Sequence, residues 1–276
     1  MSDKILYLMS EKDFDTDKLH IARKSFGDDL TDGFSLLAKE YLMVILPMAL
    51  MVILSIVLKV LLLTDLRILT AAQYDEALAI LDRNLNNNTE PSEEALSQMV
   101  SALAMEFGLL FTDFLIGSVF TALSLCLVAP YLYKRYIGKE ADLLEEIKQS
   151  FTSGLLLVLF ILGVAMTLGF FFLFIPGFLV IGYFVFTIYT YREEDVGSPL
   201  SESTRIAKGG KTKILGIFLI SFLIQFIVDI ALNTVVSLFW NVSSSTYSSW
   251  LNTGNYGMII VYQLAFNLTK ILLAPL

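Results

Sequence analysis

Long apolar runs, separated by polar segments, dominate the pattern of hydrophobic positions along the chain. Each run has about the 20 residues of helix that cross a hydrocarbon core of roughly 30 Å. None alternates apolar and polar positions as a membrane strand would, so the pattern predicts an all-α integral membrane protein with about six transmembrane helices. The expected spans are Tyr41–Leu63, Leu109–Tyr133, Phe151–Phe174, Ile175–Tyr191, Ile214–Trp240 and Tyr256–Leu276.

The six spans group into three hairpins, and the third and fourth meet at Pro176-Gly177, which favours a tight turn. A short amphipathic helix is expected on the cytoplasmic side before each hairpin. The first is Asp28–Glu40, the second is Asp142–Gln149, and the third opens at Ser198-Pro199, a favourable helix start.

The domain organisation follows from these elements. Residues 1–27 form a polar, acidic cytoplasmic segment, and 28–276 form the membrane domain. The loop 64–108 is an excursion on the extracytoplasmic side, with helices expected at Ala71–Leu85 and Ser92–Gly108, the second able to continue into the next span. Its two interpretations are a helical cap and a docking surface for a partner.

Composition and charge agree with a membrane protein and set its orientation. Hydrophobic residues make up 56% and charged residues 17% of the chain, against about 45–50% and 25% in soluble domains. The loops on one side of the membrane carry fifteen Lys and Arg residues and those on the other carry two. Positive loops stay in the cytoplasm, so both termini are expected in the cytoplasm and the protein in the plasma membrane. The net charge of −8 disfavours nucleic acid as a partner.

Polar residues inside the spans are the candidate functional residues, because they are costly in lipid. A stripe at intervals of four follows one face of the fifth span, and a second stripe follows the sixth. Counting depth at about 1.5 Å per residue puts Asp229 and Lys270 roughly 5 Å apart in depth, close enough for an ion pair or for a connection through Gln225 and Asn267. The first stripe is Ser221, Gln225, Asp229, Asn233 and Ser237; the second is Gln263, Asn267 and Lys270.

Lys59 and Asp113, each near the outer end of a span, form a second candidate pair, although Lys59 could instead extend to the membrane surface. Three interpretations of these polar residues stay open. They can be hydrogen-bonding contacts that fix which helix faces meet, or they can line a path for an ion, a proton or a small polar solute. They can also contact a lipid headgroup or a partner helix.

Motifs for common chemistry are missing from the sequence. Gly209-Gly210-Lys211-Thr212 resembles the end of a phosphate-binding loop, but Arg205 stands where that motif needs glycine. The chain has one histidine, His20, and one cysteine, Cys126. Cys126 is expected to be a small core residue. We therefore predict no catalytic, metal or cofactor site, and no enzymatic activity.

Residues 145–220 carry a recognisable series of segments. These are Glu146–Phe151, Leu173-Phe174-Ile175-Pro176-Gly177-Phe178, Tyr191–Asp195 and Ser201–Gly209. The series resembles the YciC-type family of multi-pass membrane proteins and the membrane domain of some glycerophosphodiester phosphodiesterases. The resemblance implies six spans and no catalytic function, because the phosphodiesterase domain itself is absent, and the long loop 64–108 departs from the family pattern.

The function expected from the sequence is that of a non-enzymatic accessory or scaffold subunit of a membrane complex. Its expected partners are membrane lipids and either another protein or a second copy bound through membrane helices. The alternative is a small transporter or lipid-handling protein that uses a polar path between the fifth and sixth spans.

Overall fold

A computed structural model describes residues 25–86, 93–173, 183, 186–191, 201, 203–204, 207, 211–240 and 242–275. The described residues are helical or in short connections, without strands, so the expected all-α fold is confirmed. The helices are α2 (Phe26–Asn86), α3 (Glu93–Tyr136), α4 (Leu143–Ser150), α5 (Ser153–Leu173), α7 (Thr187–Thr190), α9 (Lys211–Phe239), α10 (Ser244–Asn252), α11 (Tyr256–Phe266) and α12 (Leu268–Leu272).

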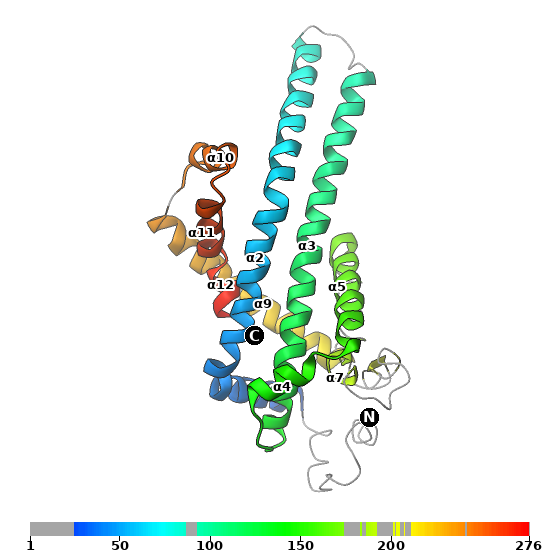
Figure 1. The fold of residues 1–276 in the computed structure, drawn as a ribbon, viewed down its shortest axis with the longest axis vertical. Helices are drawn as coiled ribbons and strands as arrows, with labels where there is room; N and C mark the ends of the chain where they lie inside the picture. The colour runs from blue at the N-terminus through cyan, green and yellow to red at the C-terminus, as the bar shows by residue number, and fades with distance from the viewer. Residues whose placement is uncertain are drawn as a thin grey trace.

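Two long antiparallel helices, α2 and α3, form the central hairpin of the molecule (Figure 1). They contain 61 and 44 residues, and at about 1.5 Å per residue α2 is roughly 90 Å long, about three times a hydrocarbon core. Pro47 and Pro130 lie inside them without ending either helix. The segment 64–108 is helical where the sequence predicted helices, but the first, Ala71–Leu85, is continuous with the first span instead of separate from it. The second continues into the second span, as the sequence allowed.

The lower half of the α2/α3 hairpin carries the apolar core. Val44 and Met48 of α2 pack with Leu127, Val128 and Tyr131 of α3 in one buried cluster. On another side of α3, α5 approaches so closely that a Cβ added to Gly163 would lie 2.5 Å from Cγ2 of Val119. Small residues permit such close contact between membrane helices. Cys126 is buried in this second cluster, as the sequence indicated.

The C-terminal helices lie along the other side of α2. Tyr256, at the start of α11, donates a hydrogen bond to Asp65 Oδ1 at 2.5 Å, and Tyr41 donates one to the carbonyl of Leu272, also at 2.5 Å. These two bonds hold both ends of the α11–α12 segment against α2. Helix α9 instead runs obliquely across α2 and α3 (Figure 1), and its N-terminal end is joined to α2 by the Lys213–Asp29 ion pair at 2.9 Å.

The described residues contain fewer candidate membrane-spanning helices than the six that the sequence predicts for the whole chain. In the described part of the chain, three helices are long and apolar enough to cross a membrane: Phe26–Asn84, Leu96–Tyr136 and Thr212–Phe239. A fourth is obtained if Leu143–Ser150 and Gly154–Gly169, which meet at 81°, are counted as one span. Most of the expected fourth span, the Pro176-Gly177 turn and the helix start at Ser198-Pro199 lie outside the described residues.

Three further differences concern local structure. The amphipathic segment Asp28–Glu40 is the beginning of α2 rather than a separate helix. The loop 241–255 contains α10, a helix that was not expected from the sequence. The expected sixth span is divided at Asn267 into α11 and α12.

Candidate functional site

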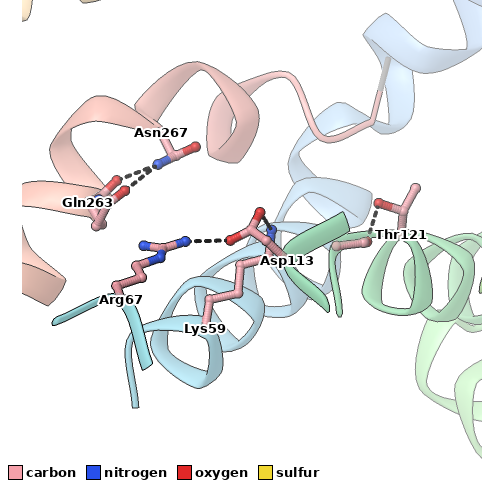
Figure 2. A network of polar contacts seen from close by, with 7 residues as sticks. Lys59, Arg67, Asp113, Thr121, Gln263 and Asn267 are labelled. Carbon is pink, nitrogen blue, oxygen red and sulfur yellow. Dashed lines mark hydrogen bonds and ion pairs between the residues drawn. The ribbon is translucent and has the colours of Figure 1, made fainter. Parts of the chain in front are cut away.

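A carboxylate held between two cations joins α2 to α3 halfway along the hairpin. Asp113 of α3 accepts a hydrogen bond from Lys59 Nζ at 2.8 Å and another from Arg67 Nη2 at 2.8 Å (Figure 2). Lys59 and Arg67 lie two helical turns apart on α2, so each reaches a different oxygen of the same carboxylate. We call these three residues the mid-hairpin cluster; it carries one net positive charge.

The neighbouring glycine explains how the ammonium group fits between the two helices. Gly117 lies one turn after Asp113 on α3, and a Cβ at this position would come within 3.2 Å of Lys59 Nζ. The side chain of Lys59 is only 22% exposed. Lys59 therefore points across to α3 and does not extend to the membrane surface.

A second ionic group, which we call the base cluster, lies at the opposite end of the apolar core. Tyr131 donates a 2.5 Å hydrogen bond to Glu40 Oε2, and Arg135 binds Glu40 Oε1 at 2.8 Å. Lys134 forms an ion pair with the buried carboxylate of Glu146 on α4. The hydrogen bond from Tyr131, together with the nearby Arg135 guanidinium, holds the pKa of the Glu40 carboxyl below its usual range.

The two clusters bracket an apolar section of α2. Glu40 and Lys59 are 19 residues apart, or about 28 Å along the helix, which is close to the thickness of a hydrocarbon core. Exposed apolar side chains cover one face of α2 between the clusters, as a lipid-facing surface requires: Leu42, Met43, Leu46, Leu50, Leu54 and Leu58. Charges therefore concentrate where this apolar section ends, as is typical of the ends of membrane-spanning segments.

The polar stripe of α9 has a different environment. Ser221, Gln225, Asp229 and Asn233 are half-buried and Ser237 is exposed. Oδ1 of Asp229 is buried and has no hydrogen-bond partner among the described residues. Lys270 is exposed and forms no ion pair with Asp229 in the described structure, so the expected Asp229–Lys270 pair is wrong. The depth count failed because it assumed two straight, parallel helices, whereas α9 is oblique and the sixth segment is divided at Asn267.

The polar residues of α11 bond mainly to one another and to α10. Asn267 Nδ2 donates to the carbonyl of Gln263 at 2.8 Å, and Gln263 Nε2 donates to the Tyr247 hydroxyl at 3.3 Å (Figure 2 shows the first pair). A side chain that bonds to the preceding turn in this way competes with the regular backbone pattern, which accounts for a break at Asn267. Thr269, just after the break, is 2% exposed, and its hydroxyl has no hydrogen-bond partner among the described residues.

Arg67 and the whole base cluster were not predicted from the sequence. Arg67, Glu40 and Arg135 lie just outside the expected spans, where charged residues look like ordinary surface positions. Two facts could have pointed to them: each cluster lies within about two turns of a span end, and each places opposite charges on the two helices of the first hairpin. In the part of the chain that the structure describes, no group of three or more His, Cys, Asp or Glu residues could hold a metal ion.

Comparison with known proteins adds no relative. No protein-family model, no curated protein and no solved structure matches the chain. The similarity of residues 145–220 to the YciC-type family therefore stays a prediction. The geometry defines an all-helical membrane protein with two ionic clusters that hold the first helical hairpin together at the ends of its apolar section.

Proposed function

We propose that this protein is a six-span plasma-membrane protein that serves as an accessory or scaffold subunit and presents the distal α2/α3 hairpin to a protein partner. The observation that carries this proposal is the distance by which the hairpin extends beyond the mid-hairpin cluster. Beyond Asp65, α2 continues for 21 residues to Asn86, which extends roughly 30 Å past the mid-hairpin cluster.

The residues of the distal α2/α3 hairpin are suited to contact with another protein. The segment 64–108 carries eight acidic and two basic residues. Apolar side chains such as Leu69, Val100 and Leu103 are exposed on it. A surface with both kinds of residue, held rigidly away from the lipid, is suited to binding a partner. In this proposal both termini are cytoplasmic and the hairpin is outside, since most Lys and Arg residues lie in the opposite loops.

Mass spectrometry of the tagged protein, purified gently in native-like lipid, tests the proposal. We expect a second polypeptide in a fixed ratio. A shortened variant with residues 71–103 replaced by a short Gly/Ser linker keeps Lys59, Arg67 and Asp113, and should lose that polypeptide while it still accumulates in the membrane. Asp229→Asn is the matched control and should retain it. Purification without any second polypeptide, or retention by the shortened variant, would refute the proposal.

A second candidate function rests on a separate observation around α9 and α12. Asp229 Oδ1 and Thr269 Oγ1 are both buried without hydrogen-bond partners in the described structure, and the membrane segment that contains Thr269 is divided at Asn267. Divided helices with unpaired polar groups are typical of solute sites in transporters. Uptake of a small polar solute or an ion into vesicles that contain the protein alone, abolished by Asp229→Asn and kept by Ser237→Ala, would favour this alternative.

A further inference from the structure

Helix α9 turns its polar side chains toward the rest of the protein and its apolar side chains outward. Ser221, Gln225, Asp229 and Asn233 of the polar stripe are half-buried. Apolar residues on the other sides of the same section are 46–64% exposed: Phe222, Leu223, Phe226, Ile227 and Ile230. Polar residues of a membrane helix face neighbouring helices or a cavity, so the stripe belongs to the contact between α9 and the helices beside it.

Two buried oxygen atoms in this region have no hydrogen-bond partner among the described residues. One is Oδ1 of Asp229, near the middle of α9, and the other is the hydroxyl oxygen of Thr269 on α12. Thr269 is 2% exposed, and α12 packs against both α9 and α2. Figure 1 shows α12 beside the central part of α9. Because α12 has only five residues, Thr269 lies close to this contact.

The charge at this contact is a single carboxylate without a cation beside it. Asp229 is the one acidic residue of α9, and α11 and α12 contain none. Lys270, the one basic residue of α11 and α12, is exposed and forms no ion pair with Asp229 in the described structure. Removing an ionised carboxylate oxygen from water is costly unless a positive charge or a hydrogen-bond donor replaces the water. Asp229 therefore needs a positively charged ligand.

The division of the last membrane segment at Asn267 provides further oxygen atoms. Helix α11 ends at Phe266 and α12 begins at Leu268, and between them Asn267 has φ −106° and ψ 18°, away from regular helical values. The last carbonyl groups of a helix lack amide donors from a following turn and carry partial negative charge. Thr269 follows these carbonyl groups by three residues.

We propose that the Asp229 carboxylate, the Thr269 hydroxyl and the carbonyl groups at the end of α11 bind one sodium ion. One carboxylate balances one positive charge, whereas calcium sites in proteins usually contain several carboxylates. Carbonyl groups at the ends of divided membrane helices are typical sodium ligands in transporters. The site rests on the membrane placement of α9 under "Proposed function" and identifies the ion for the transport alternative given there.

Thermal unfolding of the purified protein in detergent tests for the ion. Melting is compared in sodium chloride and in choline chloride at equal ionic strength, so that screening of surface charges is the same. A ligand that binds only the folded state raises Tm. At a sodium concentration roughly tenfold above Kd, the rise should be about 3–6 °C for a chain of this size. Equal Tm values of the native protein in the two salts would overturn the proposal.

Three variants locate the sodium response. Asp229→Asn should abolish it, because the substitution removes the charge that balances the ion. Thr269→Val keeps the carboxylate and the shape of the side chain, and should weaken sodium binding about tenfold through loss of one ligand. Ser237→Ala, at an exposed position of the same stripe, is the matched control and should respond like the native protein. If Asp229→Asn does not fold, Thr269→Val still tests the site. A response that Thr269→Val leaves unchanged would overturn the proposal.

Failure of the sodium site can be distinguished from failure of either proposed function. A sodium response in a protein that transports nothing would support the site and refute the transport alternative. Solute uptake that requires Asp229, in a protein without a sodium response, would support transport and overturn the sodium site. The accessory role is tested through the hairpin and its second polypeptide, so its outcome does not depend on α9.

Discussion

Individual charged residues decide how the first hairpin is held together. Asp113 accepts from both Lys59 and Arg67 at 2.8 Å, and its side chain is 31% exposed. Such a carboxylate neutralises cations that would otherwise be uncompensated near lipid. Glu40 has the same role at the other end, between Tyr131 and Arg135.

Asp113→Asn should destabilise the hairpin. The substitution leaves the Lys59 ammonium and the Arg67 guanidinium beside each other without a counter-charge, and a loss of about 1–3 kcal/mol is expected for a partly buried pair. The measurement is the free energy of unfolding in detergent micelles. Lys59→Met in the Asp113→Asn background should recover part of the loss, because it removes the uncompensated ammonium. Strictly additive losses would show that Lys59 and Asp113 are not coupled.

Tyr131→Phe tests the base cluster and its pH dependence. The variant removes the donor to Glu40, which should cost about 1–3 kcal/mol at pH 7. The pKa of Glu40 is lowered in the folded protein, so its stabilising contribution is present above the usual carboxyl pKa and is lost as the pH falls through the folded value. The difference between Tyr131→Phe and the native protein should therefore shrink below about pH 4.

Unfolding of Tyr131→Phe measured at several pH values gives this difference directly. Tyr74→Phe, at an exposed position on the hairpin, is the control and should behave like the native protein at every pH. A Tyr131→Phe effect that is constant between pH 7 and pH 3 would contradict the assigned role of the Glu40 carboxylate.

Gly163→Ala should weaken the packing of α5 on α3. The added methyl group would lie 2.5 Å from Val119 Cγ2, and overpacking of this kind costs about 1–3 kcal/mol. Val119→Ala should restore much of the loss, because it removes the atom that clashes. Gly108→Ala is the matched control: nothing lies within 4 Å of its Cβ position, and alanine is the better helix former. Equal thermal stability of the two alanine variants would contradict the close approach at Gly163.

At the scale of helices, the sequence predicted where apolar segments lie better than where helices end. Helix α9 (Lys211–Phe239) closely matches the expected span Ile214–Trp240. Helix α2 continues 23 residues past the expected end of its span at Leu63. A change from apolar to polar residues marks a membrane boundary but does not stop a helix. Between Leu63 and Asn86 there is no Gly or Pro to end it.

The candidate site was predictable where helix geometry is simple. Lys59 and Asp113 lie on neighbouring antiparallel helices joined by one connection, so matching them by depth brought the correct residues together. Asp229 and Lys270 were matched by the same reasoning, which could not include the oblique path of α9 (Figure 1) or the division of the last segment at Asn267. The path of α9 and the division at Asn267 depend on packing between distant parts of the chain, which the local sequence pattern does not encode.

Across the whole molecule, the mid-hairpin cluster lies between a lower half of the α2/α3 hairpin, which carries the apolar core, and a projecting upper half. The lower half holds the buried clusters of α2, α3 and α5. The upper half consists of the distal hairpin, with small buried residues such as Ala77 and Ala102 between its helices. Two helices alone bury little surface, so the projecting half is where a further helix, from a partner or from a second copy, adds most stability.

The membrane orientation that we propose predicts which cysteine variants can be labelled from outside the cell. Ser101→Cys on the hairpin and Thr253→Cys after α10 should react with a membrane-impermeant thiol reagent on intact cells, because both exposed positions lie on the side with few Lys and Arg residues. Glu140→Cys, exposed between α3 and α4, should react only after the membrane is opened. The native chain, with Cys126 buried, is the unlabelled control. Labelling of Glu140→Cys on intact cells would invert the orientation and place the hairpin in the cytoplasm.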